Sequence, residues 1–336
     1  MTEHTPLVEI NDLAIKFGAH TAVNNVTMDI GRGRIMGLVG ESGSGKSTIA
    51  NAIIGLLPHA AQISNGSLRF DGRDLLSFTA QDWGKIRGKD IAYVSQDPMS
   101  ALNPVLRIGE QMLDIQHLSD QSNTEKLANA LAALEQVRMP QAQARLSMYP
   151  HELSGGQKQR VCIAMVIMAR PKLLITDEAT TALDATLEVE IVRLLKELQT
   201  DIGCTMLFVT HHLTVVEELC DDVTVMYQGD IKECGTVADV FSNPSDTYTS
   251  NLLSCDPSRI EEKCRRLPIM FNLGLKELAD PETDRNRINN TSRPLLSVRH
   301  LDVTFRKPRS LIDILTGKPE QRVEAVKAAS LDIAPG

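Results

Sequence analysis

The chain has 336 residues, a formal net charge of −8, 42% hydrophobic residues and 23% charged residues. This length is enough for one large domain with some remainder, and the composition is typical of a soluble globular protein. The acidic balance argues against a general nucleic-acid binder, because such proteins are usually basic. The most apolar run, Val161 to Ala169, is too short to cross a membrane, and no secretory signal opens the chain. The six cysteines form no Cys-x-x-Cys pair, so we expect a cytosolic protein without a disulfide framework.

The predicted elements begin with two strands joined by a turn between Leu7 and Ile30, where apolar residues alternate. A buried strand at Ile35–Val39 is followed by a glycine-rich loop, and the pattern from Pro98 to Ala169 is helical. The remaining predicted elements are helices at Thr48–Leu57 and Leu187–Leu198, strands at Ile91–Val94, Leu173–Thr176 and Met206–Thr210, and a closing hairpin of Val223–Tyr227 and Ile231–Cys234. This order predicts the α/β class: a mainly parallel sheet, an N-terminal antiparallel β-subdomain and an inserted α-helical subdomain at about 98–169.

An internal repeat predicts how the chain is divided. The segment P-L-V-E-I-N-D-L-A-I-K-F, residues 6–17, matches P-L-L-S-V-R-H-L-D-V-T-F, residues 294–305. The match resumes between residues 22–33 and 325–336. We therefore expect a domain at 1–255, a linker at 256–293 rich in charge, Pro and Asn, and the incomplete start of a second such domain at 294–336. On this interpretation the chain ends inside the second copy and its tail is mobile or loosely docked; the alternative is chance similarity of two apolar hairpins.

The strongest motif is G-E-S-G-S-G-K-S-T, which fits the pattern G-x-x-x-x-G-K-[ST] and lies between a predicted strand and a predicted helix. Its glycines let backbone N–H groups curl around phosphate oxygens, and the helix N-terminus favours an anion. We expect Lys46 to reach the β- and γ-phosphates and Ser47 to bind Mg²⁺. The alternative is a glycine-rich turn that binds nothing. The residues of this phosphate loop expected to contact ATP are Gly40, Ser42, Gly43, Ser44, Gly45, Lys46, Ser47 and Thr48.

The second motif, L-L-I-T-D-E, places two adjacent acids at the end of a buried strand. Ligand sites of α/β sheets lie at the carboxyl ends of their strands. We expect Asp177 to hold Mg²⁺ and Glu178 to polarise the attacking water as general base. An acidic pair that caps the next helix is the alternative, and the phosphate loop favours the catalytic interpretation.

The third motif, L-S-G-G-Q, precedes a helical run. A Ser-Gly-Gly at a helix N-terminus is a second anion-binding cradle, and one nucleotide does not need two cradles from one domain. The motif therefore predicts a composite site built by two domains. Taken alone, Ser154 is simply a good N-cap.

In this order, G-E-S-G-S-G-K-S-T, L-S-G-G-Q-K-Q-R and L-L-I-T-D-E-A-T-T-A-L-D strongly resemble an ABC transporter ATP-binding subunit, from about Leu7 to Ser254. The resemblance implies a P-loop ATPase core that binds ATP and Mg²⁺, and a γ-phosphate bound by residues of a partner domain. It implies roles for the following residues: Ser154, Gly155, Gly156 and Gln157 at the partner's nucleotide, Asp184 at the dimer interface, Gln96 as sensor of Mg²⁺ and water, His211 at the γ-phosphate and Phe17 on adenine. Without the family, Gln96 and His211 are ordinary polar residues at strand ends, and Phe17 is a core side chain.

A subgroup is also indicated. Q-D-P-M-S-A-L-N-P, residues 96–104, and Tyr248-Thr249 resemble importers of the oligopeptide, dipeptide and nickel group, some of which have two ATPase domains in one polypeptide. Ala179 replaces the usual proline after the catalytic glutamate, and His212 replaces the usual acidic or amide residue after the histidine. Asp246-Thr247 replaces the usual His-Pro. The changes at Ala179 and His212 lie beside catalytic residues without removing them, so we expect them to affect the rate of turnover more than the activity itself.

The resemblance implies an importer motor at the cytoplasmic face of the inner membrane, bound peripherally. Its expected partners are a second ABC ATPase domain, from this protein or another subunit, two transmembrane permease subunits and, indirectly, an extracytoplasmic solute-binding protein. No nucleic-acid partner is expected. The alternatives are an ABC ATPase that acts on ribosomes or DNA, and a regulatory protein that binds ATP without turnover. The short, Pro-broken linker and the lack of sustained heptads disfavour the first alternative.

Overall fold

A computed structural model describes residues 5–95, 101–117, 119–178, 185–256, 294–306 and 322–333. The chain divides into two compact units. The described residues up to 256 belong to the first unit, and the described residues from 294 onward belong to the second.

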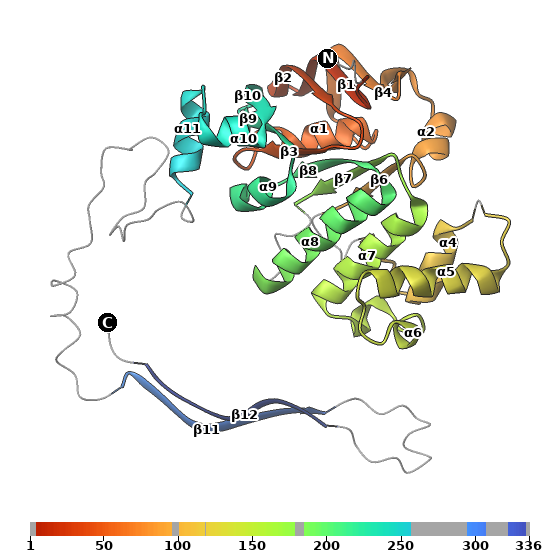
Figure 1. The fold of residues 1–336 in the computed structure, drawn as a ribbon, viewed down its shortest axis with the longest axis vertical. Helices are drawn as coiled ribbons and strands as arrows, with labels where there is room; N and C mark the ends of the chain where they lie inside the picture. The colour runs from red at the N-terminus through yellow and green to blue at the C-terminus, as the bar shows by residue number, and fades with distance from the viewer. Residues whose placement is uncertain are drawn as a thin grey trace. The chain divides into compact units, whose positions relative to one another are not determined.

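A six-stranded sheet forms the centre of the first unit, in the order β10-β9-β3-β8-β7-β6 (Figure 1). Its strands are β3 (Ile35–Val39), β6 (Ile91–Val94), β7 (Leu173–Asp177), β8 (Thr205–Val209), β9 (Asp222–Tyr227) and β10 (Asp230–Thr236). All neighbours are parallel except β9 and β10. Between these two, Gln228 and Gly229 have positive φ angles of 50° and 88°, as a two-residue hairpin turn requires. The predicted α/β class with a mainly parallel sheet is confirmed.

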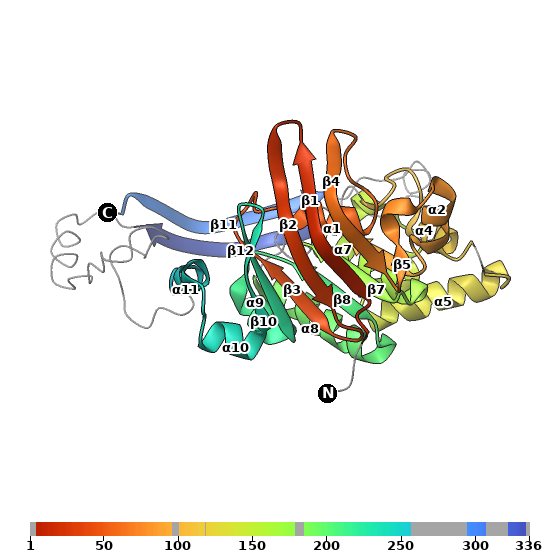
Figure 2. The same cartoon turned by 90° about the horizontal axis from the view of Figure 1, so that it is seen from above.

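An antiparallel sheet in the order β2-β1-β4-β5 forms a second layer (Figure 2). Its strands are β1 (Val8–Phe17), β2 (His20–Ile30), β4 (Ala61–Phe70) and β5 (Arg73–Asp74). Helix α1 (Lys46–Ile53) shares one apolar core with both sheets, through side chains such as Ile49 and Ile53. The sequence predicted the β1–β2 pair but not β4, because most β4 residues are exposed and give no alternating pattern.

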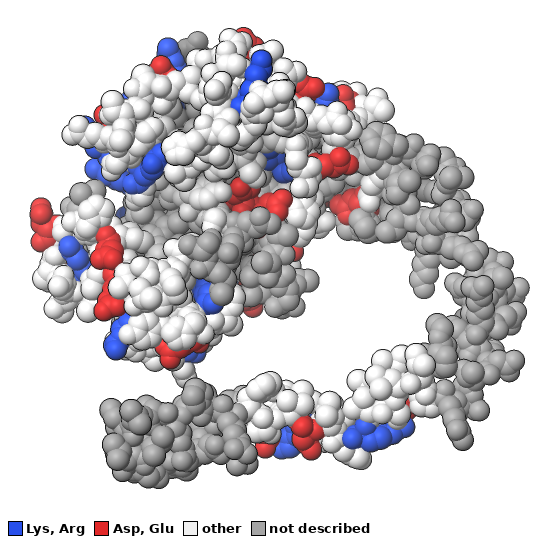
Figure 3. Space-filling view, turned by 180° about the vertical axis from the view of Figure 1, so that it is seen from behind, with Lys and Arg blue, Asp and Glu red and all other residues white. Residues whose placement is uncertain are grey.

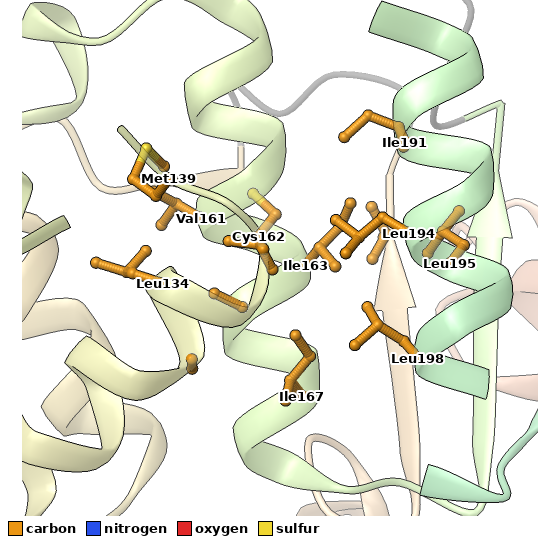
Figure 4. Close-up of a cluster of buried hydrophobic side chains, with 14 of the residues drawn as sticks. Leu134, Met139, Val161, Cys162, Ile163, Ile167, Ile191, Leu194, Leu195 and Leu198 are labelled. Atoms are coloured by element: carbon orange, nitrogen blue, oxygen red, sulfur yellow. The ribbon is translucent and has the colours of Figure 1, made fainter. Parts of the chain in front are cut away.

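Helices cover the other face of the central sheet. Alternation along each strand decides which core a side chain joins: Leu207 and Val209 of β8 face α1, while Met206 and Phe208 join a core with the helices. That core contains α7 (Gly155–Ala169) and α8 (Ala185–Ile202), and apolar side chains of α7 meet α8 on one side and α5 on the other (Figure 4). The helical subdomain contains α4 (Ile108–Ile115), α5 (Asn123–Gln136) and α6 (Ala142–Arg145). The other helices of the first unit are α2 (Ala80–Ile86), α9 (Leu213–Leu219), α10 (Val237–Ser242) and α11 (Thr247–Ser254).

The second unit contains an antiparallel hairpin of β11 (Leu296–Arg306) and β12 (Arg322–Ile333). Its register repeats that of β1–β2 pair by pair, and both hairpins interrupt their pairing at the same three places. Asp12 and its counterpart His300 both have left-handed φ angles, 49° and 48°. Each donates its N–H to a hydroxyl of the opposite strand, Asp12 to Thr27 at 2.9 Å and His300 to Ser330 at 3.0 Å. The two hairpins are thus copies of one bulged structure.

Two surface properties bear on function. Among the described residues, no helix combines the length and the apolar character that crossing a bilayer requires. On the face seen in Figure 3, basic and acidic side chains of the first unit are interspersed. Mixed charge of this kind does not form the basic stripe that a nucleic-acid-binding face presents.

Candidate nucleotide-binding site

The site lies at the carboxyl ends of adjacent parallel strands. Because β8 lies between β3 and β7, the residues that follow these strands meet at one edge of the sheet: Gly40 after β3, Glu178 after β7 and His211 after β8. The first unit thus brings together the phosphate loop, the two acids and the histidine from segments far apart in the sequence.

The backbone of the phosphate loop leaves no room for side chains at two glycines. Gly40 has a φ of +145°, and a Cβ there would lie 2.1 Å from the carbonyl oxygen of Met226. Gly45, with a φ of +100°, precedes α1, and its Cβ would lie 2.5 Å from the carbonyl oxygen of Ala22. Glycine is therefore required where the loop passes against β9 and β2.

A cavity of about 290 Å³ opens on this loop. Its lining consists of Phe17, His20, Ala22, Ser42, Gly43, Gly45, Lys46, Ser47, Thr48 and Glu178. Most of these residues were predicted to contact ATP, whereas His20 and Ala22 were not. The half-buried ring of Phe17 at the cavity wall fits its expected position beside the adenine.

Lys46 is 4% exposed, and its ammonium group lies at the centre of the loop. It donates to the carbonyl oxygens of Gly40 and Glu41, each at 2.8 Å, and to the Ser44 hydroxyl at 3.3 Å. Burial lowers the Lys46 pKa, and the charges of Glu178, Asp177 and Glu41 act in the opposite direction. The loop thus holds one cation where an anionic phosphate would bind.

Asp177, at the end of β7, has both carboxylate oxygens engaged. The Ser47 hydroxyl donates to Oδ1 at 3.0 Å, and the Tyr93 hydroxyl donates to Oδ2 at 3.1 Å. Burial raises the Asp177 pKa, and these two hydrogen bonds lower it. Burial and the neighbouring Asp177 charge also raise the Tyr93 pKa, so this hydroxyl remains a donor. A hydroxyl and a carboxylate side by side are the hard oxygen ligands that Mg²⁺ takes together with substrate phosphates, so the donor set fits Mg²⁺.

Glu178 adopts a left-handed backbone conformation, with a φ of 48°. Its N–H donates to the carbonyl oxygen of Val209 at 2.9 Å, which fixes it against the end of β8. The His211 Nδ1–H donates to Glu178 Oε1 at 3.1 Å. Glu178 also lines the cavity, so a carboxylate oriented by a histidine faces the space beside the phosphate loop.

Two residues outside the predicted site extend this arrangement. The His212 Nδ1–H donates to Glu188 Oε1 at 2.8 Å, and the His212 ring meets the His211 ring edge-on, with 4.4 Å between centroids. The sequence prediction included neither His212 nor Glu188 as a functional residue, and it also missed Tyr93. The sequence contained a signal for two of these residues. Tyr93 carries a polar hydroxyl in an otherwise apolar strand, and His212 is a second histidine directly after His211.

Ser154 lies at the N-terminus of α7. It forms a capping box with Gln157: Ser154 Oγ accepts from the Gln157 N–H at 3.4 Å, and Gln157 Oε1 accepts from the Ser154 N–H at 3.2 Å. Ser154 and Gly155 are exposed. No residue from 154 to 157 is among those that line the cavity, so the second cradle lies apart from the first. Gln96 and Asp184 lie outside the described residues.

Comparisons with known proteins agree with a nucleotide-binding site. A family model described as ABC transporter matches residues 23–181. The oligopeptide transport ATP-binding protein OppD of Salmonella typhimurium is 42% identical over 271 residues, which are 79% of this chain and 81% of that protein. The glutathione import ATP-binding protein GsiA of Escherichia coli O157:H7 is 39% identical over 326 residues, 94% of this chain and 51% of that protein. A solved dimeric ATP-binding cassette in a post-hydrolysis state, bound to ADP and Pi, matches with a TM-score of 0.61 and 28% identity over 68% of this chain and 98% of that chain.

Proposed function

Because this chain belongs to the family of ABC transporter ATP-binding subunits, we propose that it is the ATP-hydrolysing motor of an importer for a peptide or a similar small solute. The observation that best supports hydrolysis is the Glu178–His211 pair beside Lys46, at the edge where β3, β8 and β7 end. The name of the relative OppD supports an oligopeptide-type solute.

The residues of the site have distinct roles in the proposed reaction. The phosphate loop and Lys46 bind the triphosphate of ATP, and Phe17 contacts the adenine. Ser47 and Asp177 hold Mg²⁺, which supplies positive charge at the β- and γ-phosphates. Glu178 accepts the proton of the attacking water as general base, and His211 keeps the carboxylate in place and faces the γ-phosphate. Gln96 senses Mg²⁺ and the attacking water.

A second ATPase domain completes the site. Ser154, Gly155, Gly156 and Gln157 of one domain bind the nucleotide held by the other, head to tail, with Asp184 at the interface. The separation of the Ser154 cradle from the cavity supports this arrangement. We propose that residues 294–336 are the start of such a second domain, joined to the domain at 1–255 by a linker at 256–293. The matching registers of the two hairpins support this division.

Two transmembrane permease subunits receive the motion of the domain pair, and a solute-binding protein outside the cytoplasm delivers the solute to them. The motor itself is placed peripherally on the cytoplasmic face of the inner membrane. The permease partners and the location rest on the family to which OppD belongs.

Replacement of Glu178 by Gln tests the hydrolytic role. We expect Glu178→Gln to keep ATP affinity and to lower the hydrolysis rate by about 10²–10⁴-fold, which a positioned general base contributes. The amide is nearly isosteric and leaves Asp177 unchanged. Phosphate release and nucleotide binding are the measurements. Glu197→Gln is the matched control, because Glu197 lies on α8 and pairs with Arg138 at the surface. Turnover of Glu178→Gln within a few-fold of the parent would remove Glu178 from this role.

A second experiment separates transport from the alternatives. We expect hydrolysis by the chain to increase when the permease pair is supplied in lipid, and to remain unchanged with ribosomes or DNA. Stimulation by ribosomes or DNA alone would favour the non-transport ATPase. Nucleotide binding without measurable hydrolysis under every condition would favour the regulatory protein.

A further inference from the structure

We infer that His212 and Glu188 form a hydrogen-bonded pair that positions the His211 ring against Glu178, which makes both of them positioning residues for ATP hydrolysis. The inference rests on the roles proposed above for Glu178 and His211.

The geometry connects α8 to the general base through four side chains. Glu188 lies in the first turn of α8, and its Oε1 accepts from His212 Nδ1–H at 2.8 Å. The His212 ring meets the His211 ring at an interplanar angle of 81°, the edge-to-face arrangement that aromatic pairs favour. The His211 Nδ1–H then donates to Glu178 Oε1 at 3.1 Å.

The two histidines differ in how firmly the structure fixes them. His212 directly precedes α9, and its N–H donates to the Thr210 hydroxyl at 3.1 Å, so both its backbone and its ring are fixed. The exposed fractions of the two side chains are similar, 41% for His211 and 35% for His212, so the difference lies in the backbone hydrogen bond of His212 and in its shorter ring hydrogen bond, 2.8 Å against 3.1 Å. Contact with a fixed His212 ring limits the positions that the His211 ring can adopt, and a catalytic group must be held within about 0.5 Å of its productive geometry.

The pair also accounts for a departure in the sequence. The resemblance described above implies an acidic or amide residue after the histidine, and this chain has His212 there instead. Glu188 brings a carboxylate from α8 to 2.8 Å from the His212 ring. The acidic group that position 212 lacks is therefore supplied by another element, with His212 as its hydrogen-bond donor.

Steady-state ATP hydrolysis by the full chain tests the inference. It distinguishes a pair that positions His211 from a pair that only links α8 to α9 structurally. We expect His212→Ala and Glu188→Ala each to lower kcat about 10-fold, the effect of one lost hydrogen bond to a charged group, with KM for ATP within twofold of the parent. The double alanine variant should be no slower than His212→Ala, because without the His212 ring Glu188 has no contact through which to act on His211. Glu188→Gln keeps an acceptor oxygen and should retain at least half of kcat. The control is Glu197→Ala on the same helix, with parental kcat.

A further variant tests whether the carboxylate beside position 212 must come from α8. His212→Asp restores the usual acidic residue but sets it against Glu188, so we expect a loss of kcat as large as that of His212→Ala. Adding Glu188→Gln to His212→Asp removes the like charge and should recover most of kcat. Parental kcat in His212→Asp or in both alanine variants would overturn the inference. So would losses of kcat matched by a raised KM and a lowered unfolding temperature. Activity of Glu178→Gln near that of the parent would instead contradict the proposed general base.

Discussion

At the level of single residues, Lys46 shows how the phosphate loop prepares a site for an anion. Its ammonium group is enclosed by neutral oxygens, the carbonyls of Gly40 and Glu41 and the Ser44 hydroxyl. Phosphate oxygens are charged acceptors and form stronger hydrogen bonds with an ammonium group than neutral oxygens do. Binding of a triphosphate therefore improves the interactions of a cation that is already in place.

Lys46 and Ser154 are predicted to have opposite effects on ATP binding and turnover. Lys46→Ala should weaken ATP binding by the isolated chain, because each lost hydrogen bond to a charged group costs about 1.5–3 kcal/mol. Ser154→Arg should leave this affinity unchanged and abolish turnover, because in the proposed head-to-tail arrangement Ser154 acts on the nucleotide of the partner domain. Equilibrium ATP binding and steady-state hydrolysis are the two measurements.

The structure adds a control to this comparison, because Ser154 also caps α7. Loss of the cap costs about 1 kcal/mol of stability. Ser154→Asn keeps a capping side chain but lacks the hydroxyl, so it should keep the stability of the parent and lose turnover, which separates capping from catalysis. A loss of ATP affinity in Ser154→Arg as large as that in Lys46→Ala would contradict the head-to-tail arrangement.

The residues of the site could be predicted where short motifs fix their chemistry. The phosphate loop, Asp177 and Glu178 come from such motifs, whereas His211 was predicted only from the family resemblance; all of them lie at the ends of strands that finish at one edge of the sheet. Tyr93, His212 and Glu188 could not be predicted in the same way. The hydrogen bond of Tyr93 spans 84 positions and that of His212 spans 24, so both depend on which strands and helices become neighbours.

At the level of elements, Asp71 connects the antiparallel sheet to the central sheet. It lies in the turn between β4 and β5 and accepts from Arg32, after β2, at 2.5 Å and from Lys172, before β7, at 2.7 Å. These two cations lower the pKa of Asp71 to about 2. A carboxylate that is more acidic in the folded state stabilises that state wherever it is ionised.

Asp71→Asn is therefore predicted to reduce stability in a pH-dependent way. The stabilisation is present above the unfolded pKa of about 4 and is lost as pH falls from about 4 towards 2. At pH 7 we expect the unfolding temperature to fall by about 2–4 °C, a modest value because the two cations are partly exposed. The difference from the parent should vanish near pH 2. Asp120→Asn, at an exposed position, is the control, and an Asp71→Asn effect that is the same at pH 7 and pH 3 would contradict the assigned cause.

Strands whose apolar residues alternate or form a continuous run were predicted from the sequence, whereas β4 was not. The predicted bounds of β3 and β6 agree with the structure, because both strands are short, apolar and buried. Strand β4 contains Gln62, Ser64, Asn65 and Gly66, a composition typical of loops. Its pairing with β1 holds it extended, so tertiary context overrides local preference there.

At the level of the whole molecule, the division into two units predicts that the first unit is independent of the second. The first unit contains the three apolar cores of the described residues, none of which includes a residue beyond 253. Deletion of everything after Asn290 should leave ATP affinity and unfolding temperature close to those of the full chain. Nucleotide titration and thermal unfolding are the measurements. A truncated chain that unfolds or loses ATP affinity would make the second unit an integral part of the first.

The hairpin of the second unit differs from its copy in what surrounds it. In the first unit, β1 is paired on both sides and Val8, Leu13 and Ile30 are fully buried. In the second unit the counterparts Leu296, Leu301 and Ile333 are about half exposed, in a sheet of two strands. Apolar strands with open edges are templates for pairing with other chains. We therefore expect any β-rich aggregation of the 336-residue chain at high concentration to begin at this hairpin rather than at the ATP-binding unit.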